Sequence, residues 1–145
     1  MPTPILRNNV GSPIVVTAAN AVANNAYANS ADKLRIQNTG NALLADFRLT
    51  SATFGTAPVG GVMAIVAVER DFAGNAGPTP AATMLGKVYP FTPSPSTSNA
   101  STSWVMACNN VPLSADCDYW LFNNGTGLSL NTGWVLTAQP WSPGA

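Results

Sequence analysis

The chain of 145 residues contains no histidine and only one glutamate, Glu69. Catalysis by a nucleophile and a general base normally depends on histidine, because its pKa lies near neutral pH. Two cysteines without histidine also fall short of the four ligands of a structural zinc site. We therefore predict a protein that is not an enzyme, with no catalytic residues, no cofactor and no metal ion.

Charged residues are also scarce, at 8% of the chain against about 25% in ordinary soluble proteins. The six basic and six acidic residues cancel, so copies of the chain do not repel one another through net charge. Nucleic-acid binding needs clustered lysine and arginine, whereas only Lys33 and Arg35 are close neighbours among the basic residues. The composition predicts a homo-oligomer and no nucleic-acid partner.

Long hydrophobic runs are absent as well. The longest, residues 62–68, is far shorter than the ~18–20 residues of a membrane-spanning helix. The opening residues carry prolines at positions 2 and 4 and no apolar core, which does not fit a secretory signal. We expect no membrane partner and a protein made in the cytoplasm.

The remaining reactive groups are a few carboxylates and two thiols. Asp116 and Asp118 are two residues apart and would share one face of a strand, so a glycosidase-like carboxylate pair is one interpretation. The interpretation that we favour is that both carboxylates are solvated and lie at the start of a strand. Cys108 and Cys117 flank a short loop and could bond across it, but we expect both to be reduced and buried.

Strand patterns dominate the rest of the chain. Polar and apolar residues alternate over 32–38 and 45–50, as in strands with one buried face. Residues 61–69 are apolar on both faces, which indicates a central strand covered on both sides. Five further candidate strands are 13–18, 84–91, 103–108, 118–123 and 133–141.

Short strands separated by Gly, Pro and Asn turns predict an all-β fold. We predict an antiparallel two-sheet sandwich of about eight strands, of jelly-roll type, with an immunoglobulin-like sandwich as the alternative. The alanine- and asparagine-rich residues 17–31 are expected to form a short strand and a loop, with one helical turn possible.

We divide the chain into an extended N-terminal arm, residues 1–12, and one sandwich domain, residues 13–145. The arm carries no strand pattern, and residues 92–103 form a Pro/Ser/Thr tract that should be an exposed loop. Trp134 is expected in the core. Trp141, beside Pro140, is expected to be exposed, and exposed aromatics often anchor protein contacts.

Three stretches of the chain resemble capsid decoration (cement) proteins of tailed bacteriophages. They are IVVTAANAVANNAYANSADKLRIQN (14–38), GKVYPFTPSPSTS (86–98) and DYWLFNNGTGLSLNTGWVLTAQPW (118–141). The resemblance implies a jelly-roll protein on the exterior of the virion capsid, assembled in the host cytoplasm. As a dimer or trimer it would bridge subunits of the major capsid protein. The chain departs from the family pattern between Thr39 and Pro58, and an acidic element is replaced by YPFTPSP.

The arm of such a protein would lie on a neighbouring subunit and add strand-type backbone bonds. The candidate interface residues are Pro2, Pro4, Ile5, Leu6, Arg7, Val10 and Trp141. The alternative function is another virion component, a tail or fibre domain that binds host-surface glycan through Trp141 and the Ser/Thr-rich loop.

Overall fold

The computed structural model describes residues 6–17, 20–58, 60–80, 87–93 and 104–144. Within these ranges the chain forms ten strands and one short 3₁₀ helix, η1. The elements are β1 (Leu6–Asn9), β2 (Ile14–Thr17), β3 (Ala26–Tyr27), η1 (Ser30–Asp32), β4 (Leu34–Gln37), β5 (Leu44–Ala52), β6 (Val62–Glu69), β7 (Lys87–Pro90), β8 (Trp104–Pro112), β9 (Asp116–Asn124) and β10 (Val135–Gly144).

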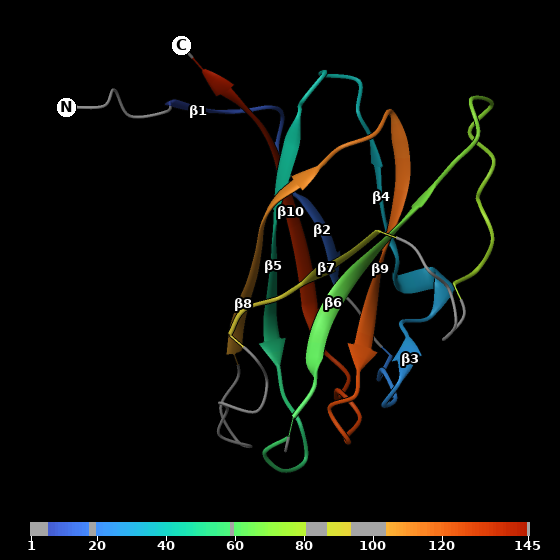
Figure 1. Ribbon diagram of the computed structural model, residues 1–145, viewed down its shortest axis with the longest axis vertical. Coiled ribbons are helices and arrows are strands. Elements are labelled where there is room, and N and C mark those ends of the chain that lie inside the picture. Colours follow the sequence, from blue (N-terminus) through green and yellow to red (C-terminus); the bar gives the residue numbers. More distant parts are fainter. Residues whose placement is uncertain (1–5, 18–19, 59, 81–86, 94–103, 145) are drawn as a thin grey trace.

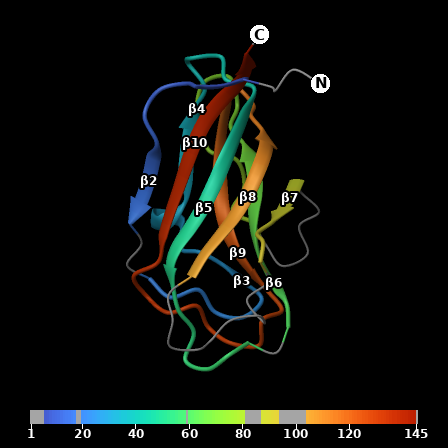
Figure 2. The ribbon, with the colours of Figure 1, turned by 90° about the vertical axis from the view of Figure 1, so that its left-hand side faces the viewer.

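The strands form two antiparallel sheets of five strands each, stacked face to face (Figures 1 and 2). In sheet 1, β5 lies between β8 and β10, and the other side of β10 pairs with both β1 and β2. In sheet 2, β6 lies between β7 and β9, and the other side of β9 pairs with both β3 and β4. The predicted all-β, two-sheet sandwich is confirmed, with ten strands among the described residues rather than about eight.

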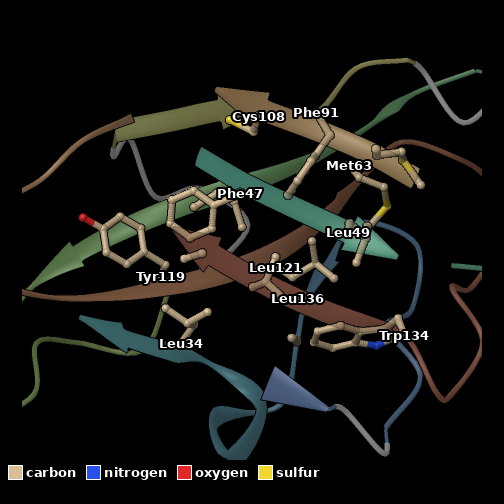
Figure 3. Packing of buried hydrophobic residues seen from close by; sticks show 14 of the residues in the cluster. Leu34, Phe47, Leu49, Met63, Phe91, Cys108, Tyr119, Leu121, Trp134 and Leu136 are labelled. Atoms are coloured by element: carbon tan, nitrogen blue, oxygen red, sulfur yellow. The ribbon is translucent and has the colours of Figure 1, made fainter. Parts of the chain in front are cut away.

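The main core lies between the two sheets (Figure 3). It follows from the alternation in the sequence: on β4, Leu34 and Ile36 are buried while Arg35 is exposed. Trp134 is fully buried, as predicted, and its indole Nε1 donates to the carbonyl of Asn20 at 2.9 Å. Burial of large apolar side chains on both inner faces, at about 25 cal/mol per Å², is the main force that holds the sheets together.

A smaller apolar cluster covers the outer face of sheet 2. It contains Val66, Val68 and Trp120, with Tyr27 and Phe122 packed against them. The Tyr27 and Phe122 rings stack with centroids 4.4 Å apart. This second layer explains why β6 is apolar on both faces.

Several details of the chain differ from or refine the predicted pattern. Residues 6–9, expected within the arm, form β1 and pair with the end of β10. The described part of residues 17–31 contains β3 and the start of η1, in keeping with the predicted short strand, loop and helical turn. Most of the predicted loop 92–103 lies outside the described residues.

Candidate protein-binding surface

The structure brings four of the predicted interface residues to one end of the sandwich. Leu6 and Arg7 lie in β1, Val10 follows it, and Trp141 lies opposite Asn9 on β10. Val10 continues the pairing, because its backbone N–H donates to the carbonyl of Pro140 at 2.9 Å. The other three predicted residues, Pro2, Pro4 and Ile5, lie outside the described residues.

One carboxylate that the sequence analysis did not single out, Asp46 on β5, holds this end together. Its Oδ1 accepts from the indole Nε1 of Trp141 at 3.0 Å and from the backbone N–H of Asn110 at 2.9 Å. Its Oδ2 accepts from the guanidinium of Arg7, which also lies over the Trp141 ring, 4.9 Å from the centroid. Asp46 therefore links four strands: β1, β5, β8 and β10.

Asp46 stays ionised in this setting. Burial alone would raise the pKa of Asp46, but the hydrogen bonds from Asn110, Arg7 and Trp141 outweigh it and lower that pKa below its ordinary value. The ion pair is thus a fixed part of the fold at neutral pH.

The expectation that Trp141 is exposed is wrong. Only 9% of its surface is accessible, because Arg7 covers the ring and Asp46 binds its N–H. Trp141 and Arg7 therefore attach β1 to the chain's own sheet. Exposure at this end comes instead from Leu6, which is more than half accessible.

Three loops that meet at the same end add two further exposed apolar side chains, Leu43 and Phe72. Backbone hydrogen bonds hold the loops together: the N–H of Leu113 donates to the carbonyl of Leu43 at 3.0 Å, and the N–H of Arg70 donates to the carbonyl of Asp116, the first residue of β9, at 3.0 Å. The hydroxyl of Ser142, at the end of β10, accepts from the N–H of Leu43 at 3.1 Å. We call this region the β1 end: β1, residues 141–144, the loops 38–43, 70–75 and 113–115, and the adjoining strand residues Arg35, Asp46 and Asp116.

Phe72 is fully exposed at the tip of a tightly bonded loop. The Asp71 carboxylate accepts from the backbone N–H groups of Ala73 at 3.0 Å and Asn75 at 2.8 Å, and from the Asn75 amide at 2.8 Å. The hydrogen bonds from Asn75 lower the pKa of Asp71. Arg70 adds a bond to the carbonyl of Gly74 at 2.8 Å, so the loop presents Phe72 from a fixed backbone.

A hollow of about 340 Å³ lies beside Phe72. Its walls come from the end of β6 and the loop after it, and from the β8–β9 loop and the first residue of β9. The lining residues are Glu69, Arg70, Asp71, Phe72, Ser114, Ala115 and Asp116. At such a surface the exposed Phe72 side chain can insert into a partner protein, and the hollow can receive a side chain from that partner.

The two carboxylates considered as an acid–base pair are ion-pair partners. Asp116 accepts two bonds from Arg35, at 3.0 and 2.8 Å, and these bonds lower its pKa. Asp118 is buried between Arg70, at 3.0 Å, and Lys33, at 3.3 Å, so the interpretation of both as solvated carboxylates is wrong for Asp118. The shift at Asp116 is opposite to the raised pKa of a glycosidase acid.

Both cysteines are free and buried, as expected. Cys108 lies on β8 and Cys117 on β9, in different sheets. Burial raises the pKa of Cys108 to about 11 and also raises that of Cys117, so both thiols remain protonated at neutral pH.

The described residues contain no group of three or more His, Cys, Asp or Glu side chains arranged to hold a metal ion. Nor do they include a helix of the length and apolarity needed to cross a membrane. The chain matches no protein-family model, no curated protein and no solved structure.

Proposed function

We propose that this chain is a structural virion protein that binds the outer surface of a bacteriophage capsid. In this role it stabilises the head by bridging subunits of the major capsid protein. The observation that carries the proposal is the β1 end, where Leu6, Leu43 and Phe72 are exposed on a bonded framework. Interfaces are commonly anchored by a few large apolar or aromatic side chains.

The framework matters because ordering a surface costs conformational entropy when it binds. Asp71 fixes the backbone around Phe72, and Asp46 fixes β1 beside Leu6. A surface ordered before binding loses less entropy on contact. The geometry thus supports a protein-binding role, and the resemblance of residues 14–38, 86–98 and 118–141 to decoration proteins suggests the capsid as the partner.

If many copies of the chain bind one capsid, the contact area at each site can be modest. A repeated lattice offers the same site many times, and an oligomer that touches two sites gains from the high effective concentration of the second. Stabilisation of the head then follows from mass action, because a protein that binds only the intact lattice shifts the equilibrium toward that lattice.

The test is quantitative mass spectrometry and cryo-EM of purified particles of the phage that encodes the chain. We expect many copies per head, with density on the capsid exterior across joints between subunits. Particles that lack the chain, or that carry a few copies at the tail alone, would overturn the proposal.

The alternative, a tail or fibre domain that binds host glycan, relied on an exposed Trp141 and on the Ser/Thr-rich loop 92–103, most of which lies outside the described residues. The burial of the Trp141 ring by Arg7 and Asp46 removes the first of these two supports. The capsid-binding proposal is therefore the one that the geometry favours.

A further inference from the structure

We infer that β2 is a dimerisation edge, on which a second copy of this chain adds its own β2 and joins the two copies of sheet 1. The inference rests on the proposed structural role and specifies how the chain associates with itself. It is carried by a comparison of the edge strands. Exposed edges present unpaired N–H and C=O groups, and proteins normally protect them with charge, proline, bulges, shortness or a covering segment.

Five of the six edge strands formed by the described residues carry such protection. Strand β1 contains Arg7, β4 contains Arg35, and β7 contains both Lys87 and Pro90. Strand β3 has only two residues. Strand β8 ends in Pro112, bulges against β5, and is covered at Ala107 by two backbone bonds with Thr92, at 2.8 and 2.7 Å.

Strand β2 has four residues, as β1, β4 and β7 do, but it carries no charge, proline, bulge or described covering segment. It reads Ile14-Val15-Val16-Thr17, without charge or proline, and its register with β10 is continuous. Figure 2 shows it as the outermost strand on its side of sheet 1. No described segment pairs with its outer edge, and Val15 is 52% exposed.

The hydrogen-bonding pattern identifies which groups point outward. The carbonyl of Pro140 accepts from Val10, and β10 runs without a register shift against β5, so alternate residues of β10 face the β1–β2 side. Ile14 and Val16, which lie opposite Ala138 and Leu136, are therefore the residues bonded to β10. The N–H and C=O groups of Val15 and Thr17 point away from the sheet.

A second copy supplies a matching edge. In antiparallel pairing across a two-fold axis, Val15 of each copy lies opposite Thr17 of the other, which forms four backbone bonds around a central pair of Val16 residues. The exposed side chains of Val15 and Thr17 then form cross-strand pairs on the outer face. The zero net charge of the chain places no electrostatic barrier against this contact.

Sedimentation equilibrium on the purified full chain tests the inference without any capsid. We expect a dimer whose dissociation constant rises about tenfold or more in Val15→Pro, which removes an outward N–H, and in Val15→Lys, which adds charge at the edge. Because the Val15 N–H does not bond to β10, both variants should keep the melting temperature of the monomer.

Matched controls are Val105→Lys on β8 and Val88→Lys on β7. These valines are 61% and 46% exposed and lie on the protected edges, so their substitution should leave the dimer intact. A monomeric wild-type chain, a dimer insensitive to both Val15 variants, or equal loss of dimer in Val105→Lys would each overturn the inference. Because no capsid is present in this measurement, a result that overturns the dimer would not count against the proposed binding to capsids.

Discussion

The two ends of the sandwich are built from different interactions. At the β1 end, ion pairs such as Arg7–Asp46 and Arg35–Asp116 fix the strands, and apolar side chains stand exposed. The opposite end, which we call the Asn123 end, comprises residues 20–29, 53–58 and 123–134 together with Gly60 and Gly61. None of these residues is charged.

Neutral hydrogen bonds hold the Asn123 end together. The buried amide of Asn123 donates to the carbonyls of Val22 at 3.0 Å and Leu128 at 2.8 Å. The Thr126 hydroxyl donates to the Asn123 side-chain oxygen at 2.6 Å. A low-polarity interior strengthens such a network and makes its disruption costly.

The comparison separates stability from binding. The Asn123 end buries its polar groups and is closed by direct contact between backbones, so it should dominate resistance to unfolding. The β1 end depends partly on charge and keeps its apolar side chains in solvent, so it should respond to pH and carry the contacts with other molecules. The following predictions test this division, from the largest effect on stability to the smallest.

The largest effect is expected for Gly61→Ala at the Asn123 end. A Cβ atom there would lie 2.3 Å from the carbonyl carbon of Gly125 and 2.4 Å from the backbone nitrogen of Thr126, and the φ of Gly61 is +73°. Overpacking against backbone and left-handed strain together should cost about 3 kcal/mol or more. That loss corresponds to a fall in melting temperature of about 6–12 °C for a chain of this size.

Gly133→Ala is the matched control for this substitution. Its φ is +89°, but no atom lies within 4 Å of the added Cβ, so the variant measures strain alone, about 1–2 kcal/mol. Equal melting temperatures for the two variants, measured by calorimetry, would show that the close backbone approach contributes nothing.

The next effect is expected for Asn123→Ala. Removing the amide leaves the carbonyls of Val22 and Leu128 without their donor inside a buried site, which should cost about 2–4 kcal/mol. The exposed Asn131 makes one side-chain bond, to Thr53 at 3.2 Å, so Asn131→Ala should cost no more than about 0.5 kcal/mol. Chemical denaturation gives the free energy of unfolding of both variants, and equal losses would show that burial of the asparagine does not determine the cost.

A smaller loss of stability, which depends on pH, is expected for Asp46→Asn at the β1 end. Loss of the charge weakens the bonds from Trp141 and Asn110 and removes the ion pair with the partly exposed Arg7, which should cost about 1–2 kcal/mol. Hydrogen exchange should show faster opening of β1, while the amides around Asn123 keep their protection.

The pH dependence follows from the lowered pKa of Asp46. The folded state binds the proton more weakly than the unfolded state, so the stabilisation is complete above the ordinary pKa of about 3.9. It is lost as the pH falls through the lower, folded value. Asp46→Asn should therefore remove part of the acid-induced loss of stability. If the free energy of unfolding of the variant falls with acid as steeply as that of the wild type, Asp46 contributes nothing to this loss.

Much of the fold could be predicted from the sequence because period-two alternation is a local signal. The pattern around Leu34 and Ile36 was enough to assign β4 and its buried face. The loop that presents Phe72 also had a local signal, since Asp71 is followed by Gly74 and Asn75, which favour tight turns.

The Asp46 site had no such signal. Its side-chain partners lie 39 and 95 residues away along the chain, at Arg7 and Trp141, so only the register of three strands brings them together. The same register buries Trp141, whose position beside Pro140 near the end of β10 had indicated an exposed ring. Long-range pairing therefore decided which residues at the β1 end are available for contact.

The smallest effect on stability is expected for Phe72→Ser, which should change the free energy of unfolding by less than about 0.5 kcal/mol because the side chain is fully exposed. Its effect on binding should be large if the β1 end is the contact surface, since exposed aromatic anchors commonly dominate an interface. Cosedimentation with capsids that lack the chain would measure this, with the exposed Val105→Ser as the matched control away from the β1 end. Retained binding by Phe72→Ser and by a second variant, Leu43→Ser, would show that contact is made elsewhere, and the division between the two ends would then describe stability alone.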